Sequence, residues 1–358
     1  MNTTQKLYMM NQFPNNADQQ VTLANWRTSP YNKWAFQHVR ELVPSANIQN
    51  NPSKAQNLPQ EKYDFSAVKV ELDNQSQLTY EEFLKITDTD ALIILKDGII
   101  IEERYFHEMA RSTPHILMSV SKSILGLLIG ILIDQKIFKT ADKVCAILPE
   151  LNSTAYKEAT IRDLLDMRTG VTFVEDYLAT SGLMIDYRKA TNWNPLENNE
   201  APSDLRSFYR LLDKKSHPDG KQFNYVSPNS DLLGWIIERS TGERFSDLLS
   251  DLFWKPLGAT MPSYITVDRF GAPRVAGGLC TTAIDLALVG QLFLDYGFSN
   301  GQQILPKNWL QDIQENGSRN AWLEGNFAEY FPNRDMHYRS KWYVDHGADD
   351  SKAELVFG

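Results

Sequence analysis

Pro114-His-Ile-Leu-Met-Ser-Val-Ser-Lys-Ser123 leads directly into an apolar run from Ile124 to Ile133, and together they predict the central helix of the protein. Ser119 and Lys122 share one face of a helix that begins near Met118, because side chains three positions apart are neighbours on a helix. The run is apolar nearly all round, which indicates a helix buried in a core. The segment therefore places a hydroxyl beside an amine at the start of a buried helix.

Ser119 and Lys122 are residue types that can serve as a nucleophile and its base. In the first turn, unpaired N–H groups and the helix dipole favour negative charge near the Ser119 oxygen. Burial would lower the pKa of Lys122 and let its amine accept the Ser119 proton. The alternative is an ordinary helix N-cap followed by a lysine that reaches solvent. A second Ser-x-x-Lys, at Ser66 and Lys69, lies in an alternating pattern that predicts a strand and opposite faces.

Composition limits the class of protein. The chain has 358 residues, of which 42% are hydrophobic and 23% charged, as in soluble globular proteins of one or two lobes. A net charge of -9 without a Lys/Arg cluster argues against a nucleic-acid partner. The longest apolar run is far short of a membrane span, and the polar N-terminus lacks a secretory signal, so we expect a cytoplasmic protein. Cys145 and Cys280 are isolated and fit a packing role in a reducing compartment.

The order of predicted elements suggests the domain organisation. Residues 1–60 read as an extension that wraps the core, 61–118 as N-terminal strands, 119–330 as a mainly helical lobe, and 331–358 as returning strands. This order predicts an α/β fold in which helices flank an antiparallel sheet built from both ends of the chain. The sequence is compatible with a homodimer.

Local signals predict individual elements. Asp97-Gly98 predicts the turn of a hairpin over 91–106, which needs further strands to be stable. The candidate partners are 68–72, 263–267, 339–344 and 354–357. The predicted helices are 161–168 capped by Thr160, 205–212 capped by Ser203, 230–241, 244–254, 284–294 capped by Thr282, and 309–314.

A serine nucleophile also needs a group that passes its proton to the leaving group. The chain has no Gly-x-Ser-x-Gly motif, His115 is expected to face solvent, and His217 lies in a loop. A phenol can do this work if a lysine cation beside it favours the phenolate. Tyr225, between a turn at Gly220 and an apolar helix, is the candidate, although a packed tyrosine at a helix entrance is the alternative.

Several motifs in a fixed order carry a family resemblance over residues 90–310. They are Ser119-Val-Ser-Lys122, Thr160-Ile-Arg-Asp-Leu-Leu, Gly220-x-x-Phe-x-Tyr225, Pro256-Leu-Gly, and Gly277-Gly-Leu-x-x-Thr-Ala-x-Asp-Leu-Ala. Together they resemble the serine β-lactamase-like family of class C enzymes, DD-peptidases and related esterases. Within that family, Lys33-Trp-Ala-Phe-x-His38, Leu117-Met-Ser-Val-Ser-Lys-Ser123 and Tyr225-x-Ser-x-Asn229 are most similar to the 6-aminohexanoate-dimer hydrolases.

The resemblance implies a β-lactamase/transpeptidase-like fold and roles for three residues. Ser119 would be the nucleophile, Lys122 its base and Tyr225 the proton shuttle. An acyl-enzyme would form on Ser119 beside an oxyanion hole of backbone N–H groups, without metal or cofactor.

Four further residues are expected on the substrate side. Tyr177 matches a substrate-side tyrosine of the 6-aminohexanoate-dimer hydrolases, and Ser227 stands where an amide is common in the wider family. Arg188 stands near where a carboxylate could pair with a substrate amine, and Asp186 could supply that charge instead.

The family's Lys/His-x-Gly strand, which supplies a second oxyanion donor, is not found. His346-Gly347 reads as a hairpin loop, and the missing strand would begin just after Gly358. We therefore expect a C-terminally truncated sequence, and losing one such donor typically costs about 3 kcal/mol of transition-state stabilisation.

The sequence thus predicts a serine hydrolase that cleaves a small amide, with linear 6-aminohexanoate oligomers as the expected substrates. One alternative is an esterase of the same family that acts on short-chain esters. Another is an inactive chain that only binds acyl ligands. The missing signal sequence and missing Lys-Thr-Gly disfavour a periplasmic β-lactamase or DD-peptidase.

Overall fold

The structure is a computed structural model that describes residues 9–72, 76–347 and 355–358. The strands are β1 (Ser45–Ile48), β2 (Lys69–Glu71), β3 (Gln77–Thr79), β4 (Ala91–Lys96), β5 (Ile99–Tyr105), β6 (His115–Ile116), β7 (Ser263–Thr266), β8 (Leu279–Thr281), β9 (Phe298–Ser299), β10 (Gln302–Gln303), β11 (Met336–Arg339), β12 (Trp342–Asp345) and β13 (Leu355–Phe357).

The α-helices are α1 (Asn32–Ala35), α2 (Tyr80–Ile86), α3 (Val120–Asp134), α4 (Val144–Ile147), α5 (Ile161–Leu165), α6 (Leu183–Ala190), α7 (Leu205–Phe208), α8 (Pro228–Thr241), α9 (Phe245–Leu249), α10 (Lys255–Leu257), α11 (Ala283–Leu294), α12 (Lys307–Glu315) and α13 (Arg319–Leu323). Within the described ranges, no helix is both long and apolar enough to cross a bilayer.

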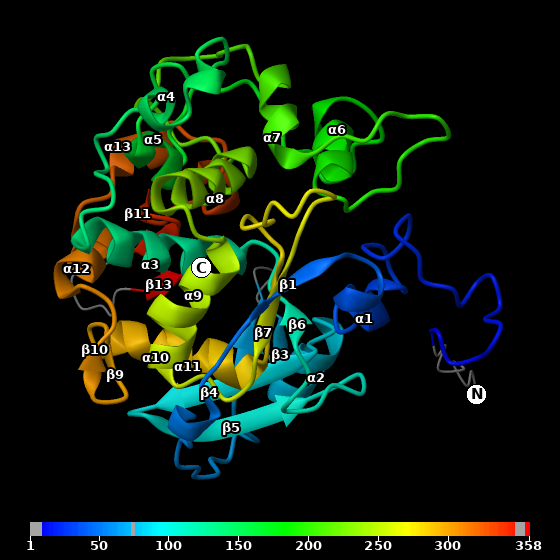
Figure 1. The fold of residues 1–358 in the computed structure, drawn as a ribbon. Coiled ribbons are helices and arrows are strands. Elements are labelled where there is room, and N and C mark those ends of the chain that lie inside the picture. The colour runs from blue at the N-terminus through cyan, green and yellow to red at the C-terminus, as the bar shows by residue number, and fades with distance from the viewer. Residues whose placement is uncertain (1–8, 73–75, 348–354) are drawn as a thin grey trace.

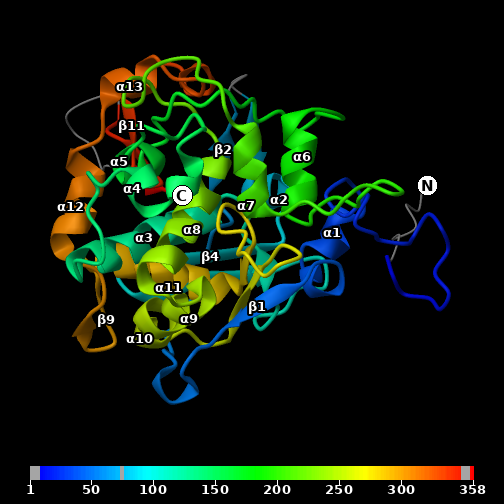
Figure 2. The ribbon, with the colours of Figure 1, turned by 45° about the horizontal axis from the view of Figure 1, so that its top comes forward.

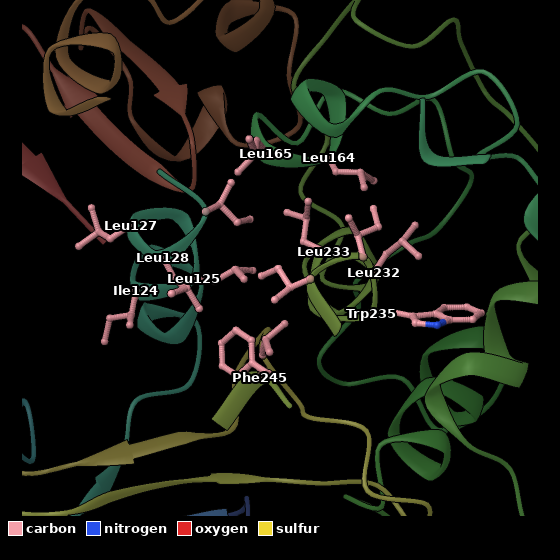
Figure 3. Packing of buried hydrophobic residues seen from close by; sticks show 14 of the residues in the cluster. Ile124, Leu125, Leu127, Leu128, Leu164, Leu165, Leu232, Leu233, Trp235 and Phe245 are labelled. Atoms are coloured by element: carbon pink, nitrogen blue, oxygen red, sulfur yellow. The ribbon is translucent and has the colours of Figure 1, made fainter. Parts of the chain in front are cut away.

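Helix α3 lies in the middle of the molecule, as its apolar sequence predicts. Figure 1 shows it between an upper group of helices that includes α4, α5 and α8 and a lower group of α9, α10 and α11 with the β4–β5 hairpin. Every residue from Ser121 to Leu132 is buried. In Figure 3, Leu125 of α3 and Leu233 of α8 lie between the two helices, with Phe245 below them. Burying each such side chain stabilises the fold by about 1.5–3 kcal/mol.

The main sheet is antiparallel and has the strand order β1-β7-β8-β6. Strand β1 comes from the N-terminal segment, where Ala46 lies opposite Ile265 of β7. This segment therefore contributes an edge strand as well as lying along one side of the molecule, opposite α12 (Figure 2). Strand β6 ends at Ile116, so the main sheet leads almost directly into α3.

The predicted hairpin is present, but its predicted partners are not beside it. Strands β4 and β5 pair through the Asp97-Gly98 turn, whose φ angles of 51° and 76° suit a tight hairpin turn. Among the described residues, the four candidate segments pair elsewhere: β7 lies between β1 and β8, β2 pairs with β3, and β11, β12 and β13 form their own sheet. The predicted strand 339–344 is wrong, because the chain turns back at Ser340 and Lys341.

Most of the predicted helices are present, but they begin or end at other residues than predicted. Thr160 caps α5 and Thr282 caps α11, as predicted. Helix α5 is shorter than predicted, because Met167 adopts a φ of 54° soon after it. Asp204, rather than Ser203, caps α7, since its carboxylate accepts the N–H groups of the first turn. Pro256 does not stop the predicted helix 244–254, which continues through a π-helical segment and α10 to Gly258.

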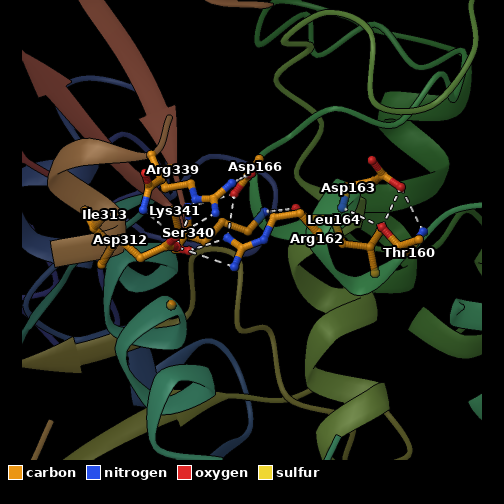
Figure 4. A network of polar contacts seen from close by, with 12 residues as sticks. Thr160, Arg162, Asp163, Leu164, Asp166, Asp312, Ile313, Arg339, Ser340 and Lys341 are labelled. Carbon is orange, nitrogen blue, oxygen red and sulfur yellow. Dashed lines mark hydrogen bonds and ion pairs between the residues drawn. The ribbon is translucent and has the colours of Figure 1, made fainter. Parts of the chain in front are cut away.

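A buried polar network fixes the β11–β12 turn against α5 and α3 (Figure 4). Asp166 accepts hydrogen bonds from the Ser340 N–H at 3.0 Å and from the Arg339 guanidinium at 2.8 Å. The Lys341 Nζ donates to the Leu164 carbonyl at 2.7 Å, and the Ser123 hydroxyl donates to the Lys341 carbonyl at 2.9 Å. The turn thereby closes one side of the helix that carries the serine–lysine pair.

Candidate active site

The backbone turns sharply just before Ser119. The Leu117 N–H donates to the Leu279 carbonyl at 2.8 Å, which holds the chain to β8. Met118 then adopts a φ of 46°, a left-handed conformation that is uncommon for a residue of its size. Ser119 occupies the N-cap position of α3, but its side chain makes no capping hydrogen bond. Ser119 is therefore the N-cap by position, as the alternative had it, but its hydroxyl does not cap the helix and contacts Lys122 instead.

Lys122 contacts Ser119 from inside the core. Its Nζ lies 2.9 Å from the Ser119 Oγ and 2.7 Å from the Ala276 carbonyl oxygen. Only 2% of the lysine is exposed, so the alternative in which its ammonium reaches solvent is wrong. Burial lowers the pKa of Lys122 to about 8, an effect that outweighs the opposing field of Glu175. About a tenth of the amine is thus neutral at pH 7, far more than for an unperturbed lysine.

The carbonyl that receives Lys122 is itself held in place. Asp231 accepts the Ala276 N–H at 2.8 Å and forms a buried ion pair with Arg274. The Arg274 guanidinium lies over the Trp193 ring, 4.9 Å from its centroid. A chain of buried polar contacts therefore supports the Lys122 amine from the side opposite Ser119.

Tyr225 joins this pair from a distant part of the sequence. Its side chain is 4% exposed, and its phenol is close enough to Ser119 for that side chain to act on its pKa. The Lys122 Nζ lies 4.9 Å from the Tyr225 ring centroid. Phe327 stacks on the same ring at 4.7 Å, and Asn326 accepts the Tyr225 N–H at 3.1 Å. The three side chains predicted to act together therefore lie beside one another.

The phenolate expectation, in contrast, is wrong. Burial and then the negative field of Glu175 raise the pKa of Tyr225 well above its usual value, and the nearby Ser119 side chain only partly offsets this. The phenol therefore keeps its proton at neutral pH. In this state Tyr225 can donate a proton as well as accept a hydrogen bond.

Glu175 was not among the predicted site residues. Its carboxylate accepts the Ser227 N–H at 2.7 Å and the Ser227 hydroxyl at 2.5 Å, at the start of α8. It also accepts the Tyr177 hydroxyl at 3.1 Å. Glu175 lies in an irregular loop without periodicity, so only its neighbour Tyr177, found by resemblance, pointed to this segment.

A cavity of about 390 Å³ opens beside the serine. It is lined by Ala24, Arg27, Thr28, Phe36, Met118, Ser119, Lys122, Glu175, Tyr177, Met184, Arg188, Trp193, Ser227, Arg274, Ala276 and Gly277. Three of the four expected substrate-side residues line it, namely Tyr177, Arg188 and Ser227. Asp186 does not, because it lies exposed on α6 and outside this lining.

A larger hollow of about 780 Å³ lies against β3 and the β4–β5 hairpin, away from this site. Ser66 lines it but Lys69 does not, and Ser66 lies in a turn where Asp64 accepts its N–H at 2.9 Å. The second Ser-x-x-Lys therefore forms no serine–lysine contact among the described residues.

The sequence predicted that His115 faces solvent, but its ring contacts a carboxylate instead. Its Nε2 lies 3.1 Å from Asp90, whose other carboxylate oxygen lies 2.8 Å from the His107 Nδ1. Both rings therefore contact the Asp90 carboxylate, and neither makes a hydrogen bond to Ser119 within the described residues. Cys145 and Cys280 are free cysteines; Cys280 is buried, whereas Cys145 is partly exposed.

Comparisons with known proteins agree with this geometry. A sequence profile of the Beta-lactamase family matches residues 83–348. The chain belongs to the β-lactamase family. This family member is 31% identical over 331 residues to the 6-aminohexanoate-dimer hydrolase of Paenarthrobacter ureafaciens, in an alignment that covers 92% of the chain and 81% of that relative.

Solved structures show the same fold. A proposed 6-aminohexanoate-dimer hydrolase from Bacillus anthracis matches this β-lactamase-family chain with a TM-score of 0.82 at 26% identity, covering 91% of the chain and 83% of that structure. A proposed β-lactamase from Bacteroides dorei matches with a TM-score of 0.57 at 20% identity, covering 75% and 82%, which shows the fold alone. The β-lactamase/transpeptidase-like fold is confirmed, and the chain is a hydrolase of the serine β-lactamase-like family.

Proposed function

We propose that this hydrolase cleaves small linear amides through an acyl-enzyme on Ser119, with Lys122 as the base and Tyr225 as the proton shuttle. The observation that carries the proposal is that the Lys122 Nζ lies 2.9 Å from the Ser119 Oγ and 4.9 Å from the centroid of the Tyr225 ring. Nucleophilic catalysis requires a base within hydrogen-bond reach of the nucleophile, and the lowered pKa of Lys122 suits an amine to that role.

Acylation would follow from the protonation states at neutral pH. Neutral Lys122 accepts the Ser119 proton as the Oγ attacks the amide carbonyl carbon. The Ser119 N–H makes no hydrogen bond within the described residues and is available to the developing oxyanion. The amide C–N bond then breaks as the Tyr225 hydroxyl passes its proton to the leaving nitrogen, and the proton held by Lys122 restores the phenol.

Deacylation would use the same groups in reverse. A water molecule gives a proton to the Lys122 amine as its oxygen attacks the acyl carbon, and Lys122 then returns that proton to the Ser119 oxygen as it leaves.

The relative from Paenarthrobacter ureafaciens, which is named for an amide dimer, supports linear 6-aminohexanoate oligomers as substrates. Esters of short acids have better leaving groups and would react through the same acyl-enzyme, so amide and ester turnover should be compared directly.

A fluorophosphonate probe tests the proposal on the intact chain. We expect a single covalent adduct by intact mass, lost in Ser119→Ala and kept in the matched control Ser66→Ala. Peptide mapping should place the adduct on Ser119. A chain that folds cooperatively but is not labelled, or is labelled equally in Ser119→Ala, would overturn the proposal and favour a chain that only binds acyl ligands.

A further inference from the structure

The cavity beside Ser119 carries an unusual excess of guanidinium groups. Its lining side chains include Arg27, Arg188 and Arg274 but only one carboxylate, that of Glu175. All three arginines have a buried Nε with no hydrogen-bond partner within the described part of the chain. A buried guanidinium without an anion is costly, because water no longer stabilises its charge.

Of these three arginines, Arg274 has a carboxylate that neutralises its charge. It forms an ion pair with Asp231 and lies 4.4 Å from the centroid of the Tyr187 ring. The field of Asp231 holds the pKa of Arg274 above its usual value, against the opposing effect of burial. The charge of Arg274 is therefore already balanced inside the protein.

Arg188 and Arg27 have no such counter-ion. Arg188 is 8% exposed and donates only to neutral acceptors, the Tyr177 carbonyl at 2.8 Å and the Ala179 carbonyl at 3.3 Å. Arg27 donates to the side-chain oxygen of Asn194, also neutral. Neither takes part in an ion pair among residues 9–72, 76–347 and 355–358.

The two charges also act on each other. Burial and repulsion from Arg188 and Arg274 lower the pKa of Arg27 to about 10. An anion between the guanidinium groups would remove this repulsion. Asp176 and Glu175 favour the charge of Arg188 through space, but neither forms an ion pair with it, and the Glu175 oxygens accept hydrogen bonds from Ser227 and Tyr177 instead.

We propose that Arg27 and Arg188 bind a carboxylate of the substrate, so that the preferred substrates are amides with a free carboxylate a short aliphatic chain away from the scissile bond. The inference rests on the proposed function, since it concerns the cavity beside the Ser119 nucleophile. A guanidinium suits a carboxylate because its planar fork offers paired N–H donors. The same arginines would repel a substrate that presents an ammonium group at this position.

The carboxylate could belong to the acyl part or to the leaving amine, and two substrate series separate these cases. The acyl series is p-nitrophenyl hexanoate, p-nitrophenyl 6-aminohexanoate and mono-p-nitrophenyl adipate. The leaving-group series is hexanamide N-substituted by a hexyl chain or by 5-carboxypentyl. In one series we expect the carboxylate compound to have a kcat/KM at least about tenfold above its neutral partner, as for a hydrogen bond to a charged group.

Variants test whether the arginines cause the preference. Arg188→Gln and Arg27→Gln should each lower the ratio of carboxylate to neutral turnover towards one, while the exposed Arg244→Gln should leave that ratio unchanged. Arg188→Lys keeps the charge but loses the fork and should lie between. No carboxylate preference in either series, or a preference that survives both Gln variants, would overturn the inference.

A binding measurement keeps this result separate from the proposed function. In Ser119→Ala, which cannot form an acyl-enzyme, hexanoate should raise the melting temperature and hexylamine should not. If neither substrate series is turned over and no probe labels Ser119, the proposed function fails. If substrates are turned over but hexanoate does not bind and neutral chains are preferred, only the carboxylate site fails.

Discussion

The buried amine of Lys122 gives the protein a distinctive pH dependence. Burial lowers its pKa from 10.5 to about 8, and the catalysis through Ser119 proposed above requires the neutral form. At pH 7 about a tenth of the lysine is then neutral, compared with about one part in 3,000 for an unperturbed amine, and the shift corresponds to about 3 kcal/mol. We expect kcat/KM to rise about tenfold from pH 6 to 7, to bend near pH 8 and to level off above pH 9.

The assay is hydrolysis of a p-nitrophenyl ester between pH 6 and 9.5, with the Ser119→Ala rate subtracted as the background. Glu175 is the largest contribution that raises the pKa of Lys122, so Glu175→Gln should move the bend to lower pH. The exposed Glu71→Gln on β2 is the matched control and should leave the bend in place. A flat profile, or one that keeps rising towards pH 10.5, would refute the assignment of Lys122 as a buried neutral base.

Three predictions concern stability and can be read from urea unfolding. Between about pH 8 and 10.5 the unfolded chain holds the Lys122 proton and the native chain does not, so stability should increase with pH in that window. Burial also lowers the pKa of Lys341 well below its usual value, which acts in the same direction, so Lys122→Met should reduce the increase without abolishing it. Gly126→Ala should destabilise by several kcal/mol, because its Cβ would lie 2.1 Å from a backbone oxygen of the β11–β12 turn, whereas Gly290→Ala on α11 meets open space and should stabilise slightly. Asp166→Ala leaves the buried Ser340 N–H without its acceptor, while Arg162 and Arg339 still pair with Asp312, and should cost about 1–3 kcal/mol. Glu158→Ala removes an exposed ion pair and should cost less than about 1 kcal/mol.

The parts of the site that the sequence predicted are those whose signal is local. The apolar run after Ser119 has the period and length of a helix, and α3 follows it closely. Spacing on that helix was enough to bring Lys122 to Ser119. Tyr225 needed the resemblance as well, because nothing local shows that a residue in another segment meets the same hydroxyl.

The parts that were missed depend on contacts between distant segments. The β11–β12 turn was predicted as continuous strand because neither Ser340 nor Lys341 readily adopts a positive φ, and the contacts that hold the turn, from Asp166 to Ser340 and from Leu165 to Lys341, come from a distant segment. The protonated state of Tyr225 depends on burial and on Glu175, neither of which a sequence pattern reveals. The arginine pair has the same origin, since Arg27 and Arg188 meet only in the folded cavity.

The hydrogen bond from Ser123 to Lys341 has a consequence for biosynthesis. It joins residues 218 positions apart, so the apolar helix α3 leaves the ribosome long before the last segment that packs against it is synthesised. At about 5–20 residues per second, that interval is about 10–40 s. During this time a nascent chain would expose the apolar surface of α3, which is the kind of surface that chaperones bind.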